Sequence, residues 1–229
     1  MEYFEYHNVV IETPNSPEAE AYRKLELNLR MQAIDTELKV IQTTSPTPKD
    51  GKTTTAINLA AVYAERGLKV LIIDFDLRKP KIHRAFKKAN EFGFYDFIVD
   101  DKDIDDLIIK DDSKIDLLLS GSRITSPHIV LQSNKTKNMV EKLKERYDVI
   151  IVDSPPILSV TDAFIISEIV DGVIFVVAYN QTKKEDAKNA LEQLEDTEAN
   201  ILGSVFANVD PKKHRYGYNY YYRENGDEE

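Results

Sequence analysis

The segment from Thr44 to Thr53, with the sequence TSPTPKDGKT, carries residues suited to binding phosphate groups. It follows an apolar run and opens a helical pattern, which is the context that a phosphate-binding loop requires. Backbone N–H groups of the loop and of the helix N-terminus would face the phosphates. We expect Lys52 to reach the β- and γ-phosphates, Thr53 to offer its hydroxyl to Mg²⁺, and Gly51 to allow close backbone approach.

The loop departs from the usual pattern at one position, since Pro46 stands where the first glycine is expected. An ordinary turn between a strand and a helix is therefore the competing interpretation. Two acidic motifs elsewhere in the chain fall where a phosphate-binding loop requires them, and they favour nucleotide binding. The other loop residues expected to contact the nucleotide are Lys49, Asp50 and Thr54.

These acidic motifs end two apolar runs. LIIDFD ends with Asp74 and Asp76, and VIIVD ends with Asp153. In a parallel sheet the carboxyl ends of the strands meet at one edge, where ligands bind. Alternate residues along a strand point the same way, so Asp74 and Asp76 are expected to share one side. We expect Asp153 to hold Mg²⁺ opposite Thr53.

The same residues could catalyse phosphoryl transfer. One of Asp74 and Asp76 would accept the proton of an attacking hydroxyl and the other would help to hold the metal; the sequence leaves open which does which. The expected catalytic residues are Lys52, Asp74, Asp76 and Asp153. The expected metal ligands are Thr53, Asp76 and Asp153.

Two charged residues near these strand ends have more than one interpretation. Arg78 could bind the nucleotide through a phosphate, or it could cap the end of its strand. Asp162 lies at a helix start beside the loop after Asp153, and a helix cap explains it best.

The segments that would position these residues alternate between two patterns. Near-continuous Val, Ile and Leu runs are typical of strands covered on both faces, and helical patterns separate most of them. We therefore predict an α/β fold with a doubly wound, mostly parallel sheet flanked by helices. The predicted strands are 38–42, 69–74, 115–119, 148–153, 172–178 and 201–207. The predicted helices are 17–34, 53–65, 133–146, 161–170 and 183–195.

The chain is expected to have three parts. Residues 1–16 read as an extended N-terminal arm, residues 17–209 as the catalytic domain, and residues 210–229 as a polar, disordered tail. Ser16 and Pro17 predict a helix start at the domain boundary. Within the domain, 79–112 shows only short amphipathic pieces.

Composition excludes several classes of protein. The 229 residues fit one α/β domain, and the absence of cysteine excludes disulfides, thiolate zinc sites and a cysteine nucleophile. A net charge of −10 argues against nucleic acid as a partner. No apolar run approaches the ~18 residues of a spanning helix, and the acidic, aromatic N-terminus does not resemble a signal peptide. We expect a cytoplasmic chain whose membrane link would come through a partner.

Tyrosines cluster near the C-terminus, where five of the chain's 12 lie between His214 and Arg223. A polar segment interrupted by Gly and Asn cannot bury five rings, so the cluster is an interaction patch or a substrate. Phosphate on neighbouring tyrosines would add negative charge able to separate subunits. A tail that stacks on nucleic-acid bases is the alternative. The expected phosphate acceptors are Tyr216, Tyr218, Tyr220, Tyr221 and Tyr222.

Together these features resemble the bacterial tyrosine kinases, or BY-kinases, which are P-loop NTPases with a MinD/ParA-like fold. The likeness is strongest to the stand-alone kinases of capsular-polysaccharide assembly, the CpsD/CapB type, and extends from about Pro17 to the tail. The runs that carry it are 44–45, 48, 51–53, 73–80, 147–156, 161–163, 201–203 and 208.

This resemblance implies substrates and partners. The chain would use ATP and Mg²⁺ to phosphorylate tail tyrosines of neighbouring copies, and Asn208 would help to hold the purine. A membrane adaptor of the polysaccharide co-polymerase type would activate it and keep it at the inner face of the cell membrane, and a cognate tyrosine phosphatase would reverse the reaction. Cycling between phosphorylated monomers and unphosphorylated rings would regulate capsule or exopolysaccharide synthesis and export.

Two positions differ from the family pattern. Lys49 stands where relatives have glycine. In the E-x-x-R-x-x-R motif that mediates ring assembly, Glu20 and Arg23 match, but the last position is Glu26, with Arg30 one turn further on. Self-association is expected through Glu20 and Arg23, and the usual octamer is in question.

Two other functions compete with the kinase. A positioning ATPase of the MinD/ParA type would carry a lysine early in the phosphate loop, but that position is Thr47. Such proteins also end in a basic amphipathic helix, unlike this tyrosine-rich tail. A nucleotide-binding scaffold without catalysis is the third candidate, although the expected catalytic residues are all present.

Overall fold

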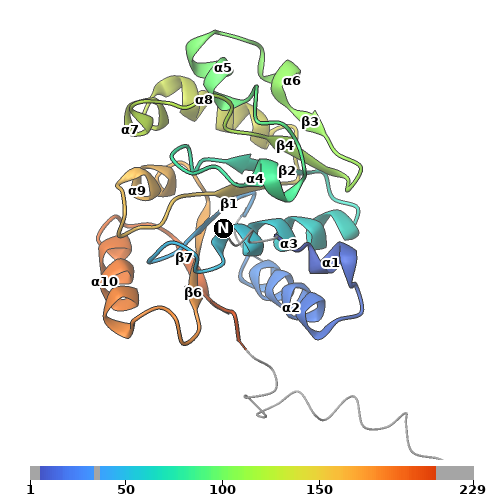
Figure 1. The fold of residues 1–229 in the computed structure, drawn as a ribbon, viewed down its shortest axis with the longest axis vertical. Coiled ribbons are helices and arrows are strands. Elements are labelled where there is room, and N and C mark those ends of the chain that lie inside the picture. The colour runs from blue at the N-terminus through green and yellow to red at the C-terminus, as the bar shows by residue number, and fades with distance from the viewer. Residues whose placement is uncertain (1–5, 34–36, 210–229) are drawn as a thin grey trace, which may run out of the picture.

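A computed structural model describes residues 6–33 and 37–209, and these form a seven-stranded sheet with the order β3-β4-β2-β5-β1-β6-β7. Strand β3 pairs antiparallel with β4, and the other neighbours are parallel. The sheet and its flanking helices confirm the predicted fold class (Figure 1). The strands are β1 Val40–Thr44, β2 Val70–Asp74, β3 Ile109–Lys110, β4 Ile115–Leu118, β5 Val149–Asp153, β6 Gly172–Ala178 and β7 Ile201–Ala207.

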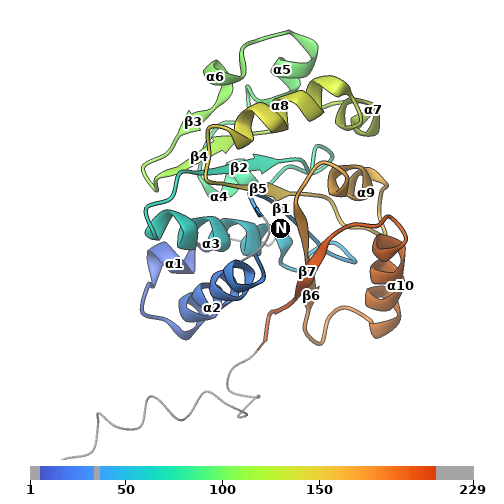
Figure 2. The same ribbon diagram turned by 180° about the vertical axis from the view of Figure 1, so that it is seen from behind.

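Helices cover both faces of this sheet. Figure 1 shows α1, α2 and α3 on one side, with α9 and α10 on the other, and Figure 2 shows the same layers from behind. All five predicted helices are present, with ends that differ by a few residues. The helices are α1 Val9–Glu12, α2 Pro17–Gln32, α3 Lys52–Glu65, α4 Ile82–Ala85, α5 Phe94–Val99, α6 Ile104–Leu107, α7 Pro127–Leu131, α8 Asn134–Lys144, α9 Asp162–Ser167 and α10 Lys184–Glu195.

Alternation along β2 explains why the strand is apolar throughout. Ile72 packs in the cluster beneath α2 and α3, whereas Leu71 and Ile73 pack in the cluster beneath α5, α8 and α9. Each face of the sheet thus has its own core, and every residue of β2 is buried. Because β1, β2 and β5 run parallel, the polar residues at their carboxyl ends lie at one edge of the sheet.

The N-terminal segment differs from the predicted extended arm, because Val9–Glu12 form one helical turn. Val10 is buried, and its N–H donates to the side-chain oxygen of Asn58 in α3 at 3.2 Å. The Asn58 amide also donates to the carbonyl of His7 at 3.0 Å. A single turn is too short to show a helical period, which is why the sequence pattern missed it.

The next helix begins where the sequence predicts. The Ser16 hydroxyl accepts a hydrogen bond from the N–H of Ala19 at 3.1 Å, and Pro17 occupies the first turn. Leu29 is buried, while Tyr22 and Leu25 pack against the same core from its rim. The predicted apolar face of α2 is therefore confirmed.

The region 79–112 contains α4, α5, α6 and β3. Phe94 of α5 packs edge-on against Phe75 with ring centroids 4.9 Å apart, which anchors this region to the end of β2. No strand was predicted at β3, whose two residues are too few for a pattern, and helix α7 was not predicted either.

The tail and the possibility of a membrane-spanning helix were also considered from sequence. The tail 210–229, with its predicted disorder, lies outside the described residues. Among residues 6–33 and 37–209, no helix has both the length and the apolar character needed to cross a membrane.

Candidate nucleotide and phosphoryl-transfer site

Backbone geometry at the start of α3 requires glycine. Gly51 caps this helix in the left-handed region with φ of +94°. A Cβ atom built on it would lie 2.8 Å from the Cβ of Ala207, at the end of β7. Both the conformation and the close approach exclude a side chain here, so the loop reaches α3 without a bulky group between it and a bound phosphate.

The loop before Gly51 is braced by Asp50, which is fully buried. Its carboxylate accepts hydrogen bonds from the Thr47 N–H at 2.8 Å and from the Thr182 hydroxyl at 2.7 Å. The Asp50 side chain is thus occupied within the protein, and a contact between this residue and nucleotide would have to use its backbone N–H.

Two unusual loop residues have local explanations. The carbonyl of Pro46 accepts a hydrogen bond from the N–H of Leu158 at 3.2 Å, a bond for which proline serves as well as glycine. Lys49 has φ of +74°, a conformation that costs a side-chain-bearing residue about 1 kcal/mol. This explains why glycine suits the position of Lys49 in the family pattern.

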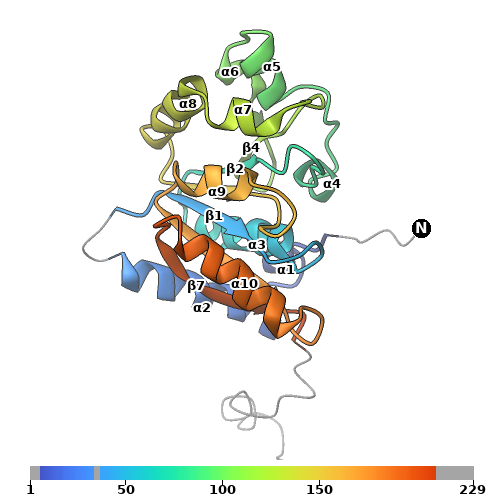
Figure 3. The ribbon, with the colours of Figure 1, turned by 90° about the vertical axis from the view of Figure 1, so that its left-hand side faces the viewer.

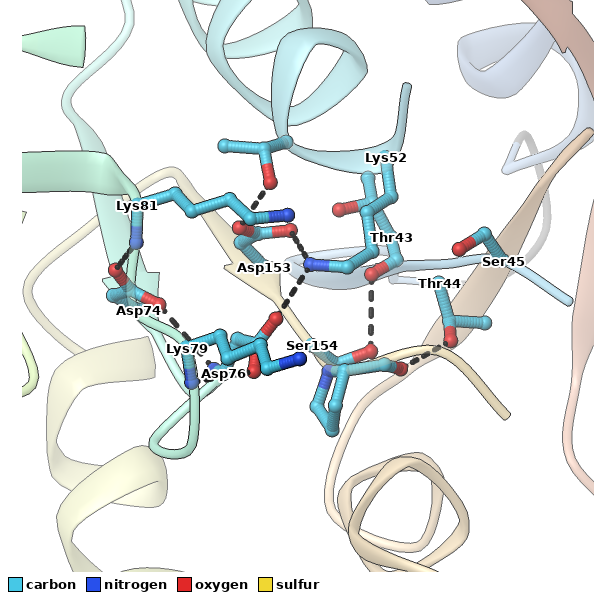
Figure 4. A network of polar contacts seen from close by, with 12 residues as sticks. Thr43, Thr44, Ser45, Lys52, Asp74, Asp76, Lys79, Lys81, Asp153 and Ser154 are labelled. Atoms are coloured by element: carbon cyan, nitrogen blue, oxygen red, sulfur yellow. Dashed lines mark hydrogen bonds and ion pairs between the residues drawn. The ribbon is translucent and has the colours of Figure 1, made fainter. Parts of the chain in front are cut away.

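The predicted catalytic groups meet at the carboxyl edge of the sheet (Figure 4). The Lys52 ammonium lies 3.1 Å from Asp76 and 3.1 Å from Asp153. The Thr53 hydroxyl donates to the other oxygen of Asp153 at 2.7 Å. These distances confirm the predicted proximity of the groups, and all four residues are buried.

Asp74 and Asp76 have different partners. One oxygen of Asp74 accepts the N–H groups of Lys81 and Ile82 at 2.9 and 3.0 Å, at the start of α4. Asp76 instead faces Lys52 and accepts the N–H of Lys79 at 3.2 Å. Because β2 ends at Asp74, strand alternation does not extend to Asp76, and the two carboxylates do not act as an equivalent pair.

Burial and crowding shift the proton affinities of these groups. Burial, together with the charges of Asp153 and Asp76, raises the pKa of Asp74 to about 7. Burial also raises the pKa of Asp153, against the opposing charge of Lys52. Burial alone would lower the pKa of Lys52, but Asp153 and Asp76 raise it above its ordinary value, so the ammonium stays charged.

The donor set fits Mg²⁺ that arrives with a nucleotide. Thr53 and Asp153 offer hard oxygen ligands side by side, and the three carboxylates outnumber the single paired lysine. Within the described ranges, no three His, Cys, Asp or Glu side chains form a metal-binding group. Mg²⁺ needs no such cage, since it commonly keeps waters and phosphate oxygens beside one or two protein ligands.

Arg78 makes a contact that was not considered from sequence, and its binding to a nucleotide phosphate stays a prediction. Its guanidinium pairs with Asp162 through two contacts, Nε to Oδ2 at 2.8 Å and Nη2 to Oδ1 at 3.1 Å. Asp162 is fully buried, and the cap of α9 is Thr161. The pair ties the loop after β2 to α9, and a separation of 84 residues leaves no sequence signal for it.

Lys81 is a site residue that sequence reasoning missed. Figure 4 shows its side chain extending from the start of α4 toward the carboxylate of Asp153. Burial lowers its pKa and Lys52 lowers it further, whereas Asp153, Asp76 and Asp74 oppose the shift. The only available signal was its position in the basic run after Asp76.

The predicted assembly residues make contacts within the chain. The Arg23 guanidinium pairs with Glu65 at the end of α3, with two N–O distances of 2.9 Å, and approaches Glu20 at 3.4 Å. Glu26 is buried and contacts Arg66 and Arg30. A role for Glu20 and Arg23 between subunits stays a prediction.

Other predicted residues make none of the contacts described above. Asn208 follows β7 with φ of +59° and an exposed side chain, and Thr54 lies in the first turn of α3. Their nucleotide contacts, and that of Lys49, stay predictions. The acceptor tyrosines Tyr216, Tyr218, Tyr220, Tyr221 and Tyr222 lie outside the described residues.

Comparison with known proteins identifies close relatives of the chain. Residues 39–203 match the model of a family described as an AAA domain. Tyrosine-protein kinase YwqD of Bacillus subtilis is 36% identical over 214 residues, covering 92% of this chain and 90% of YwqD. Tyrosine-protein kinase CpsD of Streptococcus pneumoniae is 36% identical over 207 residues, covering 88% and 89% of the two chains.

Solved structures agree with these relatives. The chimerical protein CapA2B2 superposes with a TM-score of 0.83 at 35% identity, covering 86% of this chain and 88% of that one. The kinase domain of the Escherichia coli tyrosine kinase ETK gives 0.83 at 27% identity, covering 96% and 87%.

The MinD-type alternative has weaker support. MinD of Pyrococcus horikoshii has a TM-score of 0.63 at 23% identity, covering 74% of this chain and 70% of that one, and so shares the fold alone. The long matches to tyrosine kinases, together with the buried Lys52, Thr53 and Asp153 at the sheet edge, decide the family. This chain belongs to the bacterial tyrosine-protein kinases.

Proposed function

We propose that this kinase transfers the γ-phosphate of ATP, bound with Mg²⁺, to tail tyrosines of neighbouring copies of itself. The observation that carries the proposal is the meeting of Lys52, Thr53 and Asp153 at the start of α3, beside a glycine that admits no side chain. The proposed acceptors are Tyr216, Tyr218, Tyr220, Tyr221 and Tyr222.

In the proposed reaction, the phenolic oxygen of the acceptor forms a bond to the γ-phosphorus while the bond from that phosphorus to the bridging oxygen of ADP breaks. Lys52 stabilises the charge that develops on the transferred group. Mg²⁺, when bound, neutralises charge on the phosphate oxygens. The protein otherwise positions the reactants, which is its main contribution in phosphoryl transfer.

Asp74 is the better candidate to accept the phenolic proton. A carboxylate with a pKa of about 7 is well matched to proton transfer near neutral pH. From the residues that the structure describes, its Oδ1 atom accepts one long contact, 3.3 Å from the Asp76 N–H, and so retains capacity for a proton. Asp76 is instead held by Lys52 at 3.1 Å, which suits a role in holding the lysine and the metal.

The biological setting follows from the family resemblance. We infer a cytoplasmic enzyme held at the inner face of the cell membrane by an adaptor of the polysaccharide co-polymerase type. Phosphorylation would control ring assembly and, through it, capsular or exopolysaccharide synthesis and export. A cognate tyrosine phosphatase would reset the cycle.

Intact-mass spectrometry of the purified protein with Mg-ATP tests this proposal. The full chain is expected to gain a ladder of up to five phosphates, and a chain truncated after Asp210 is expected to gain none. Both samples are measured with and without the cytoplasmic segment of a candidate adaptor. Phosphate on the truncated chain, or none on the full chain in either condition, would overturn the assignment of acceptors to the tail.

A further inference from the structure

We propose that Lys81 binds the γ-phosphate of ATP, as a second cation beside Lys52. This inference rests on the proposed use of ATP, and it deepens that function by assigning a residue that distinguishes ATP from ADP. It concerns a side chain that no motif of the phosphate loop or of the acidic strand ends contains.

The backbone of Lys81 is fixed to the catalytic edge. Its N–H donates to the Asp74 carboxylate at 2.9 Å, and the next residue, Ile82, donates to the same oxygen at 3.0 Å and is fully buried. The root of the side chain is therefore held by a catalytic carboxylate. From this root the side chain extends over the site toward Asp153 (Figure 4).

The ammonium of Lys81 is left available for a ligand. Of all residues in 6–33 and 37–209, none provides a carboxylate oxygen within the 4.0 Å of an ion pair to it. Its charge nevertheless interacts at longer range with Asp153 and Asp76. A half-buried cation that no described carboxylate contacts loses hydration without a close compensating contact from this part of the chain. A phosphate group would supply that contact.

Two other described cations near this edge have carboxylate partners. Arg78 is paired with Asp162, and Lys52, the first proposed phosphate-binding cation, contacts Asp76 and Asp153. The early loop position is Thr47, whose hydroxyl lies 3.1 Å from Asp50. A triphosphate brings about four negative charges, so a second ammonium at the end near Thr53 and Asp153 would stabilise the terminal phosphate most.

A purely structural role for Lys81 would affect nucleotide binding differently. If it only balances the charge of Asp153 and Asp74, its removal would affect ATP and ADP alike. If it binds the γ-phosphate, its removal would weaken ATP binding and leave ADP binding nearly unchanged. The ratio of the two dissociation constants therefore separates the alternatives.

The experiment is a calorimetric titration of the full chain with Mg-ADP and with a non-hydrolysable Mg-ATP analogue. Lys81→Met is expected to weaken binding of the analogue about tenfold, while ADP binding changes less than about twofold. Lys79→Met is the matched control, because the Lys79 side chain is exposed and only its backbone N–H contacts Asp76. Lys81→Arg, which keeps the charge, should recover part of the lost affinity.

Equal weakening of both nucleotides, or no weakening of either, would overturn the proposal. A melting temperature is recorded for every variant, and Lys81→Gln replaces Lys81→Met if the latter fails to fold. The two proposals can fail separately. Normal nucleotide binding without tail phosphate would contradict the proposed acceptors but not the role of Lys81. An unchanged ratio of the ATP and ADP dissociation constants in Lys81→Met would contradict only the role of Lys81.

Discussion

The two ends of α3 carry charge clusters of opposite character. At its start, Lys52 contacts Asp76 and Asp153, with Asp74 close by, and all of these side chains are buried. Negative charge is in excess there. Figure 3 shows the fold turned by 90°, with α10 toward the viewer and α2 and α3 behind it.

At the other end, acids and bases are balanced. Arg23 of α2 pairs with Glu65 through two contacts and lies 3.4 Å from Glu20. Glu26 contacts both Arg66 and Arg30, so three acids face three bases. The three arginines of this cluster are 29–54% exposed. Balanced charges whose arginines remain partly solvated can hold two helices together without a ligand, whereas a buried cluster with excess negative charge is suited to receive a cation. We propose that the first cluster serves chemistry, whereas the second joins α2 to α3.

Removing a charge at each end of α3 should separate these roles. Lys52→Met is expected to reduce phosphate incorporation at least about a hundredfold, because it removes the cation that stabilises the transferred group. Glu65→Gln, at the other end, should leave the rate within about threefold. Phosphate per chain is measured by intact mass over time. A comparable loss of phosphate incorporation in Lys52→Met and Glu65→Gln would contradict the division of α3 into a catalytic end and a structural end.

The stability of the catalytic end should depend on pH. A folded-state pKa of about 7 for Asp74, above the ordinary value of 3.8, means that the folded chain holds a proton that the unfolded chain releases. This contribution to stability is therefore present at low pH and lost as pH rises from about 4 through 7. Its upper limit is about 4 kcal/mol.

Asp74→Asn cannot ionise and should remove this dependence. In nucleotide-free protein, the free energy of unfolding of Asp74→Asn relative to the natural chain should rise between pH 5 and pH 8 by up to a few kcal/mol. Urea denaturation at several pH values provides the measurement, with Asp148→Asn as a surface control. A difference that stays flat with pH would contradict the raised pKa.

A smaller effect on stability is expected at Glu26 in the balanced cluster, where the family motif has arginine. Glu26→Arg would place a third guanidinium beside Arg66 and Arg30 at a buried position, and should destabilise the chain by about 2–3 kcal/mol in urea denaturation. Glu26→Gln, which removes only the charge, should cost less. A stable Glu26→Arg protein that assembles into larger rings would instead favour a role for this position between subunits.

The smallest expected effect lies in the loop itself. Lys49→Gly relieves a left-handed conformation, but it also gives the unfolded chain more freedom, so a gain of about 1 kcal/mol or less is expected. Thermal melting measures it, with Lys39→Gly in the extended segment before β1 as a destabilised comparison. A loss of stability at Lys49 would mean that the contacts of its side chain outweigh the strain.

Proximity of Lys52, Thr53 and Asp153 could be predicted because it depends only on local rules. Apolar runs ending in Asp identify strands of a parallel sheet, and the carboxyl ends of such strands converge. The helix start at Pro17 followed from its own capping residues. In each case a few neighbouring residues contain the whole signal.

Other features could not be predicted because they arise from packing between distant segments. Arg78 and Asp162 are 84 residues apart, and either alone has an adequate local explanation. Glu26 is buried only because α2 lies against the end of α3. Lys81 reads as one lysine in a basic run until the turn after β2 directs it toward Asp153.

The most direct test of the central account is a mixing experiment between two defective chains. A chain truncated after Asp210 keeps the complete site at the start of α3, and a full-length Lys52→Met chain keeps the tail. Neither alone should gain phosphate from Mg-ATP. Their mixture should show phosphate on the tail of the Lys52→Met chain, because one copy supplies catalysis and the other the acceptor. Phosphate on Lys52→Met alone, or none in a mixture under conditions where the natural chain is phosphorylated, would contradict transfer between copies through this site.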